Sequence, residues 1–176
     1  MTFRQSDYTK EMLEFHLPRY HEIPSIELYM DQVIGYIEDA LLVFRIYEKE
    51  KIITSSMVNN YVKQGLVSAP VKKKYNRKHI AYIIVVCLLK PILSISEICD
   101  YIERQIETSP IETAYDYFAD KLEESLYCSF TGTAPENDGR TTEEATVVKL
   151  VAMAFSNKMY LQKYLLYLKD EKEAEN

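Results

Sequence analysis

The chain contains 176 residues, 47% of them hydrophobic, so it can bury the core of one moderate domain and is not disordered throughout. Four glycines and six prolines are too few for the many tight turns of an all-β fold, so helices are expected. The formal net charge of −6 makes the chain acidic as a whole.

The first 47 residues are expected to form an arm followed by one long helix. Residues 1–24 are mixed in character, which suggests a short arm packed on the body. Ser25 stands at the position of a helix N-cap, and apolar residues then recur at spacings of three and four. This spacing predicts a helix over residues 26–47, whose inward face comprises Ile26, Met30, Val33, Ile34, Ile37, Leu41 and Phe44.

A shorter helix is predicted over residues 55–64. Thr54 or Ser55 can cap its start, and Gly65 is suited to the left-handed residue that ends a helix. Small polar side chains would occupy its outer face. Its expected inward residues are Val58, Tyr61 and Val62.

The rest of the chain is predicted to be helical apart from two irregular segments, residues 68–76 and 131–140. Further helices are expected after a cap at Asn76, from the capping box Ser94-x-x-Glu97 to about residue 107, over residues 111–130, and from Thr141-x-x-Glu144 onward. Tyr115, Phe118, Leu122 and Leu126 share one side of the 111–130 helix.

The last helix carries apolar residues on two faces, so it is expected to be buried centrally or to lie in a subunit interface. The two sets are Ala145, Val148, Ala152, Phe155 and Met159, and then Val147, Val151, Ala154, Leu161, Leu165 and Leu168. Together these elements predict an all-α fold. A first helical region would cover residues 1–108, and a helical extension, either separate or part of the same domain, would cover residues 109–176.

The cysteine content and the apolar runs favour a soluble cytoplasmic protein. Cys87, Cys99 and Cys128 are odd in number and lie among apolar residues, which is typical of reduced thiols. No signal-peptide pattern opens the sequence. The longest apolar run, residues 80–89, is about half the length that a bilayer requires, so no membrane contact is expected.

Positive charge is concentrated between residues 51 and 96. This stretch contains no Asp or Glu and has eight Lys and Arg residues, a formal +8, so the rest of the chain sums to −14. Such segregation indicates a local anion-binding surface on a body that otherwise repels anions.

The same stretch has the plan of a helix-turn-helix DNA-binding unit. A short polar helix fits the major groove, and a lysine-rich loop beside it neutralises phosphates. We therefore expect double-stranded DNA as a partner. The groove-facing residues would be Ser55, Ser56, Asn59, Asn60 and Lys63, and the phosphate-binding residues would be Lys72, Lys73, Lys74, Arg77 and Lys78.

Two resemblances sharpen this expectation. Residues 54–98 resemble the DNA-binding part of MerR-type regulators, in the matching places Gly65-Leu66, Pro70, Lys72–Tyr75, Arg77 and Ile95–Ile98. Residues 17–100 are similar to a bacterial family known as domain of unknown function 1836, most specifically in "LYMDQV" and "MVNNYVKQGL". The first resemblance implies a MerR-like helix-turn-helix in a transcription regulator that binds operator DNA as a dimer. This sequence departs from that family in a short stretch between Gly65 and Tyr75, which trims the wing, and in the long N- and C-terminal helices on which the unit would pack. The second implies no particular activity.

No pattern of residues indicates an enzyme. The three histidines show no metal-ligand spacing, the cysteines form no C-x-x-C, and no phosphate-binding glycine loop or nucleophile motif is present. Carboxylates such as Glu123 and Glu124 are expected on solvated faces. We therefore expect no catalytic residue, metal or cofactor.

Two other functions remain open at this point. The basic loop could dock an acidic protein partner, in which case the two-faced last helix would serve an adaptor or a homodimer. Alternatively, the C-terminal helices could enclose a small ligand, which requires an apolar pocket between residues 111–130 and 141–169.

Overall fold

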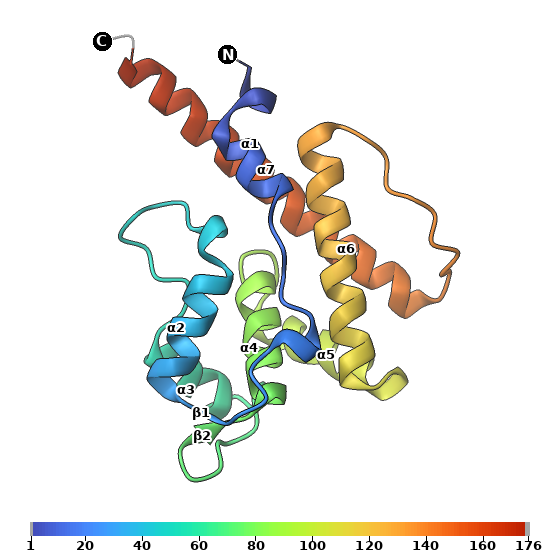
Figure 1. The fold of residues 1–176 in the computed structure, drawn as a ribbon. Coiled ribbons are helices and arrows are strands. Elements are labelled where there is room, and N and C mark those ends of the chain that lie inside the picture. The colour runs from blue at the N-terminus through green and yellow to red at the C-terminus, as the bar shows by residue number, and fades with distance from the viewer. Residues whose placement is uncertain (1, 175–176) are drawn as a thin grey trace.

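The computed structural model describes residues 2–174 and is mainly α-helical, as predicted (Figure 1). The α-helices of this part of the chain are α1 (Asp7–Leu13), α2 (Met30–Ala40), α3 (Ser55–Lys63), α4 (Arg77–Leu89), α5 (Ile95–Thr108), α6 (Ile111–Thr131) and α7 (Glu143–Ala174). Short 3-10 turns occur at η1 (Phe3–Gln5), η2 (Tyr20–Glu22) and η3 (Leu42–Phe44), and two short strands, β1 (Leu28–Tyr29) and β2 (Lys74–Tyr75), pair antiparallel.

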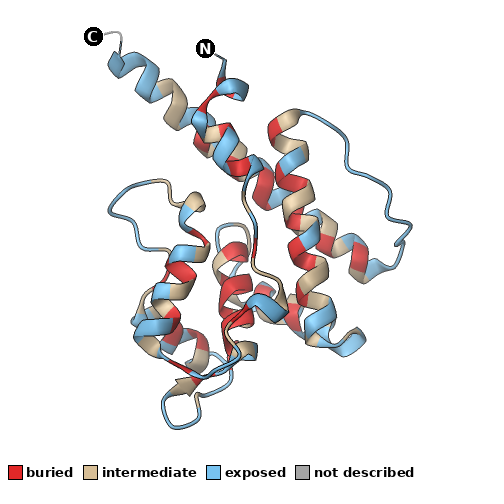
Figure 2. Ribbon diagram, in the orientation of Figure 1, coloured by how far each residue is buried: buried red, intermediate tan, exposed pale blue. Residues whose placement is uncertain are grey.

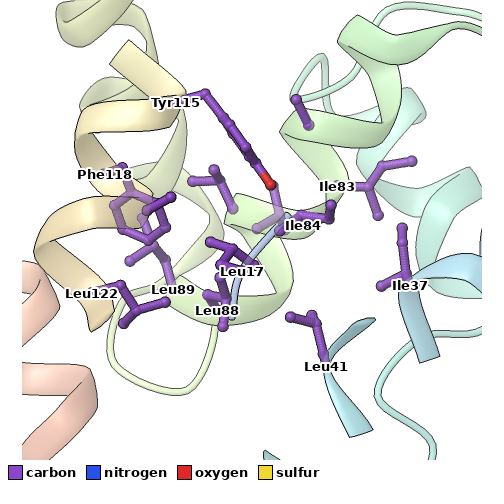
Figure 3. Packing of buried hydrophobic residues seen from close by; sticks show 14 of the residues in the cluster. Leu17, Ile37, Leu41, Ile83, Ile84, Leu88, Leu89, Tyr115, Phe118 and Leu122 are labelled. Atoms are coloured by element: carbon purple, nitrogen blue, oxygen red, sulfur yellow. The ribbon is translucent and has the colours of Figure 1, made fainter. Parts of the chain in front are cut away.

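Helix α4 forms the centre of the core because it is apolar around its whole circumference. Figure 3 shows it between α2 on one side and α6 on the other. Its residues Ile83, Ile84, Leu88 and Leu89 are buried to 1% exposure or less. The buried cluster continues without a break from the α2 side to Phe118 and the rest of α6.

Helices α6 and α7 pack side by side and form the second half of the core. The first apolar set of α7, which includes Val148, Ala152 and Phe155, is buried as predicted. The second set is exposed or half-buried, with Leu161 and Leu165 among the most exposed apolar residues that the structure describes (Figure 2). The long C-terminal helix therefore lies against the body with one face and leaves an apolar face outside.

The N-terminal arm packs on the body, as predicted, and ion pairs hold it to α6. Arg19 donates two hydrogen bonds to the Glu123 carboxylate, at 2.7 and 2.8 Å, and lies 2.9 Å from Asp120. The backbone amide of Leu17 donates a third hydrogen bond to Glu123 at 2.8 Å. The expectation of a solvated Glu123 is wrong, because this carboxylate is the anchor of an arm that lies more than one hundred residues earlier in the sequence.

The single long helix predicted over residues 26–47 is not present. Residues Leu28 and Tyr29 instead form strand β1, the helix begins at Met30, and it ends at Ala40 before the turn η3. Ser25 is therefore not the N-cap. The backbone groups of β1 form hydrogen bonds with β2 instead of within a helix. Ile26, which the prediction placed on the inward face, is 68% exposed.

Most helix boundaries set by local caps are confirmed. The Thr54 hydroxyl accepts a hydrogen bond from the Met57 amide, the Asn76 side chain from the His79 amide, and the Ser94 side chain from the Glu97 amide. The last helix starts one residue later than predicted, because Thr142 rather than Thr141 accepts from the Ala145 amide. Over residues 2–174, none of the helices has both the length and the apolar character needed to cross a membrane.

Candidate nucleic-acid interface

Helix α3 presents an uninterrupted polar face to solvent. Val58 and Tyr61 are buried and Val62 is half-buried, so the opposite side of the helix points outward. The outward residues, all exposed, are Ser55, Ser56, Asn59, Asn60 and Lys63. No side-chain hydrogen bond joins any of these five to another described residue, so their donors and acceptors are available to a ligand.

Both ends of α3 are fixed. Gly65 adopts a φ of +80° directly after the helix, and the amides of Leu66 and Val67 return to the carbonyl of Tyr61. At the start, the Glu38 carboxylate accepts a hydrogen bond from the Ile53 amide at 3.0 Å, one residue before the Thr54 cap. The outer side of α3 is exposed to solvent, so the hydrogen bonds at its two ends help to fix the position of the helix.

The segment predicted to be irregular, residues 68–76, contains a tight two-residue turn. The amide of Val71 donates to the carbonyl of Lys74 at 3.1 Å, and the amide of Lys74 donates back at 2.9 Å. The two central residues, Lys72 and Lys73, have φ values of 50° and 64°. This is the turn geometry that normally requires Asn or Gly, and each lysine held in it costs about 1–2 kcal/mol.

Strand pairing anchors this turn to the body. Leu28 pairs with Tyr75 and Tyr29 pairs with Lys74, which binds the base of the turn to the segment just before α2. Tyr75 is buried, and the ammonium of Lys74 lies 5.3 Å from the centre of the Tyr29 ring. Lys72 and Lys73 are exposed and have no ion pair among the described residues. We call residues 71–74 the basic turn.

The basic turn and α3 lie at the same end of the molecule. Figure 1 shows both beside the β1–β2 pair, at the end opposite the two termini, and Figure 2 shows the tip of the turn as exposed ribbon. The structure thus places the residues predicted to face a groove and the lysines predicted to bind phosphate at the same end of the molecule.

The two cations at the start of α4 differ in their surroundings. Lys78 is exposed and lies 5.8 Å from the Tyr82 ring centre. Arg77 is half-buried, and its guanidinium donates to the carbonyls of Ile23 at 2.8 Å and His21 at 3.3 Å. Arg77 therefore joins the N-terminal arm to α4, and only part of its hydrogen-bonding capacity remains for a phosphate.

His79 stabilises the base of the same region. Its ring lies 3.0 Å from the Ser68 hydroxyl and 2.7 Å from the Asn76 side chain. Burial, together with the charge of Lys78, lowers the pKa of His79, against the opposing effects of a hydrogen bond from its ring to the Ala69 backbone and the charge of Glu27. The ring is therefore neutral at neutral pH and contributes hydrogen bonds, rather than a positive charge, to the surface.

The connection before α3 is longer than the turn of a standard helix-turn-helix. Helices α2 and α3 are joined by residues 41–54, whereas that motif uses three or four residues. The segment includes η3 and an exposed stretch, residues 47–51. Helices α2, α3 and α4 pack with the β1–β2 pair, but the link between the first two helices is longer than the turn of that motif.

Sequence reasoning missed two features of this surface. The strained backbone of Lys72 and Lys73 has no sequence signal, because neither Asn nor Gly marks the turn. The contact between Tyr29 and Lys74 was also missed, because the sequence predicts that Tyr29 belongs to a helix. Within residues 2–174, no group of three or more His, Cys, Asp or Glu side chains is placed to hold a metal ion.

Comparison with known proteins assigns the chain to one family. Residues 18–118 match the model of the family described as Domain of unknown function (DUF1836). The match covers more than half of the chain and includes α2, α3, the basic turn and α4, so the protein belongs to this family. No curated protein and no solved structure matches the chain.

Proposed function

From this family membership, which carries no activity in its description, and from the geometry of the basic turn, we propose that the protein is a DNA-binding transcription regulator. Its DNA-binding unit is a MerR-like helix-turn-helix with a trimmed wing. Helix α3 is the recognition helix, and the basic turn is the wing. The protein acts in the cytoplasm of a bacterium and catalyses no reaction.

The strained pair Lys72 and Lys73 is the observation that carries the proposal. Non-glycine residues held in strained backbone conformations cluster at functional sites. Here it places two exposed ammonium groups, without a carboxylate partner among the described residues, at the tip of a hairpin. An anion with closely spaced negative charges, such as a DNA backbone, matches this arrangement.

The two parts of the surface would make different contacts. Lysines of the basic turn, together with Lys78, would neutralise phosphates and would not distinguish sequences. Asn59 and Asn60 lie on the outer face of α3, and an amide side chain can form two hydrogen bonds with adenine in the major groove. Affinity would therefore come mainly from the turn, and sequence preference from the helix.

We also propose that two copies associate through the outer face of α7. Residues on this face recur at alternating spacings of four and three, which is the spacing of a coiled-coil seam. They are Leu150, Ala154, Asn157, Leu161, Tyr164 and Leu168. No acidic residue occurs between Glu144 and Asp170, so the seam brings no carboxylates together when it meets a second copy. A dimer whose two α3 helices are about 34 Å apart would reach successive major grooves.

Fluorescence anisotropy with a labelled random-sequence duplex tests the proposal. The triple variant K72A/K73A/K74A should bind more weakly than the wild type at low salt. The matched control is K169A on α7, which removes one exposed lysine far from the turn and should leave binding unchanged. If the wild type does not bind DNA at low salt, the basic turn serves another partner, and an acidic protein becomes the better candidate.

A further inference from the structure

A cavity of about 360 Å³ lies where the segment between α2 and α3 meets α4 and α7. It is separate from the candidate DNA-binding surface, although Met57 on the inner side of α3 forms part of its wall. Its volume lies within the range of small-molecule sites, about 300–1,000 Å³. It is not the pocket expected from sequence, because α6 does not contribute to it. A cavity of about 410 Å³ between α6 and the start of α7 is instead lined largely by Thr and charged side chains.

The inner walls of the 360 Å³ cavity are apolar. Phe44, Met57, Leu88, Phe155 and Met159 line it from four different segments of the chain. The Phe44 and Phe155 rings meet edge to face with their centres 5.0 Å apart. Two methionines give the walls some capacity to adapt to the shape of a bound molecule.

Its polar lining is predominantly cationic. Lys51, Lys90, Lys158 and Arg45 contribute four positive charges, and Glu50 is the one acidic residue among the lining side chains. The Glu38 carboxylate lies 2.5 Å from Arg45 and offsets its charge. The three lysines therefore outnumber the remaining carboxylate three to one. Lys158 already donates to the Pro91 carbonyl at 2.8 Å, which holds its ammonium at the α4 end of the cavity.

Two polar atoms of the lining are buried without a partner among the described residues. They are Nε of Arg45 and Oε1 of Gln162. A buried donor or acceptor that remains unpaired costs about 1–3 kcal/mol, and native proteins keep few of them. Both atoms are almost inaccessible to solvent, so a bound molecule could pair with them only if the Arg45 or Gln162 side chain moved.

The geometry points to a binding site for an amphipathic organic anion, a molecule with one acidic head group and an apolar body. Its apolar body would contact the Phe44, Phe155 and Met159 side chains. Its carboxylate, or an equivalent acidic group, would lie among Lys51, Lys90 and Lys158. A neutral apolar molecule or a cation would fit this site less well, because it would bring no negative charge to the three lysines.

This site is placed to influence α3. Residues 44–52 form one side of the cavity and lead into the Thr54 cap, and Met57 is part of α3 itself. If the proposed function holds, a ligand bound here would alter how firmly the recognition helix is positioned. The binding site itself does not depend on that function and can be tested without DNA.

Methionine methyl groups provide a direct probe of binding. The chain has six methionines, of which Met57 and Met159 line the cavity, whereas Met12, Met30 and Met153 do not. The full chain, labelled with ¹³C at the methionine methyl groups, would be titrated with octanoate and, separately, with octanol. Octanoate should shift the Met57 and Met159 signals and leave Met12 and Met153 unchanged. Octanol should bind about tenfold more weakly, which corresponds to about 1.4 kcal/mol for the charged head group.

Lysine variants test the head-group contacts. K51Q/K90Q/K158Q should bind octanoate no better than octanol, whereas the corresponding Lys→Arg triple should keep the preference for octanoate. K169Q, on the same helix as Lys158 but outside the cavity, is the matched control.

Two results would contradict the proposed binding site, and both can be obtained with the wild-type protein alone. One is that octanoate does not shift the Met57 and Met159 signals of the wild-type protein. The other is that octanol binds as tightly as octanoate. If octanoate binds as expected and the protein fails to bind DNA, the site stands and the proposed regulatory function falls.

Discussion

Lys72 and Lys73 are consecutive residues that both occupy the left-handed backbone region, at φ of 50° and 64°. Glycine or asparagine would adopt this turn with less strain. The double variant K72N/K73G should therefore be more stable than the wild type by about 1–2 kcal/mol in all, because asparagine keeps part of the strain and glycine loses more backbone entropy on folding. It should also bind DNA more weakly, because two phosphate contacts are lost.

Urea unfolding and fluorescence anisotropy on the same samples test whether stability rises while DNA affinity falls. The control K72A/K73A removes the same charges, but alanine, like lysine, is strained at a positive φ. This variant should therefore lose DNA binding without gaining stability. If K72N/K73G gains stability and retains full DNA affinity, the lysines are not the phosphate contacts.

Arg77 and Lys78 are neighbours with different predicted roles. R77A removes a guanidinium that holds the Ile23 and His21 carbonyls, so it should destabilise the fold by about 1–3 kcal/mol. K78A removes an exposed lysine and should change stability by less than about 0.5 kcal/mol while weakening DNA binding. Thermal unfolding of both variants makes the comparison, and equal stability losses would contradict the assignment of Arg77 to the arm.

Asn59 and Asn60 are expected to provide sequence preference. After a preferred site has been selected from random DNA, N59A/N60A should lose about 1–3 kcal/mol of discrimination for each base contact removed. Binding to non-specific DNA should be almost unchanged, because the lysines remain. A uniform loss of affinity on all sequences would instead indicate that these residues contact the DNA backbone.

The outer face of α7 should determine the oligomeric state. Leu161 and Leu165 are 60% and 64% exposed, so L161E/L165E should fold normally. It should nevertheless run as a monomer in light scattering after gel filtration, where the wild type should be a dimer. The control T146E changes an exposed residue at the start of the same helix and should leave the dimer intact. A monomeric wild type at high concentration would contradict the α7 interface.

The anchored carboxylate Glu123 predicts a loss of stability in acid. Burial acts to raise its pKa, but hydrogen bonds from Arg19 and the Leu17 amide outweigh this and lower it below the ordinary value of 4.5. Its stabilising effect is therefore complete above pH 4.5 and is lost as the pH falls through the lower, folded-state pKa. E123Q should be less stable at pH 7 and should lose less stability than the wild type on acidification. Unfolding curves from pH 7 to pH 3 would show this, and parallel curves for the two proteins would contradict it.

Elements that depend on neighbouring residues were predictable from the sequence. Thr54, Asn76 and Ser94 each bind an amide three residues away, and Gly65 ends α3 by its own backbone preference. The inward and outward faces of α3 follow from spacing alone. For the same reason, the candidate DNA-binding residues could be proposed before the fold was known.

Features that depend on distant residues were not predictable. Ile26 continues the apolar spacing of α2, so the segment that contains Leu28 resembled the start of the helix, yet Leu28 pairs with Tyr75 across the sheet. Glu123 looks like any exposed carboxylate until the arm brings Arg19 to it. Arg77 similarly appeared free because its carbonyl partners lie more than fifty residues earlier in the chain.

The most direct test of the account is the salt dependence of binding to a random-sequence duplex, measured by fluorescence anisotropy. If the basic turn binds phosphates, the logarithm of the affinity should fall steeply and linearly with the logarithm of the salt concentration. K72A/K73A/K74A should reduce that slope by about three units. Absence of binding at low salt, or a slope that the triple variant leaves unchanged, would contradict the central claim.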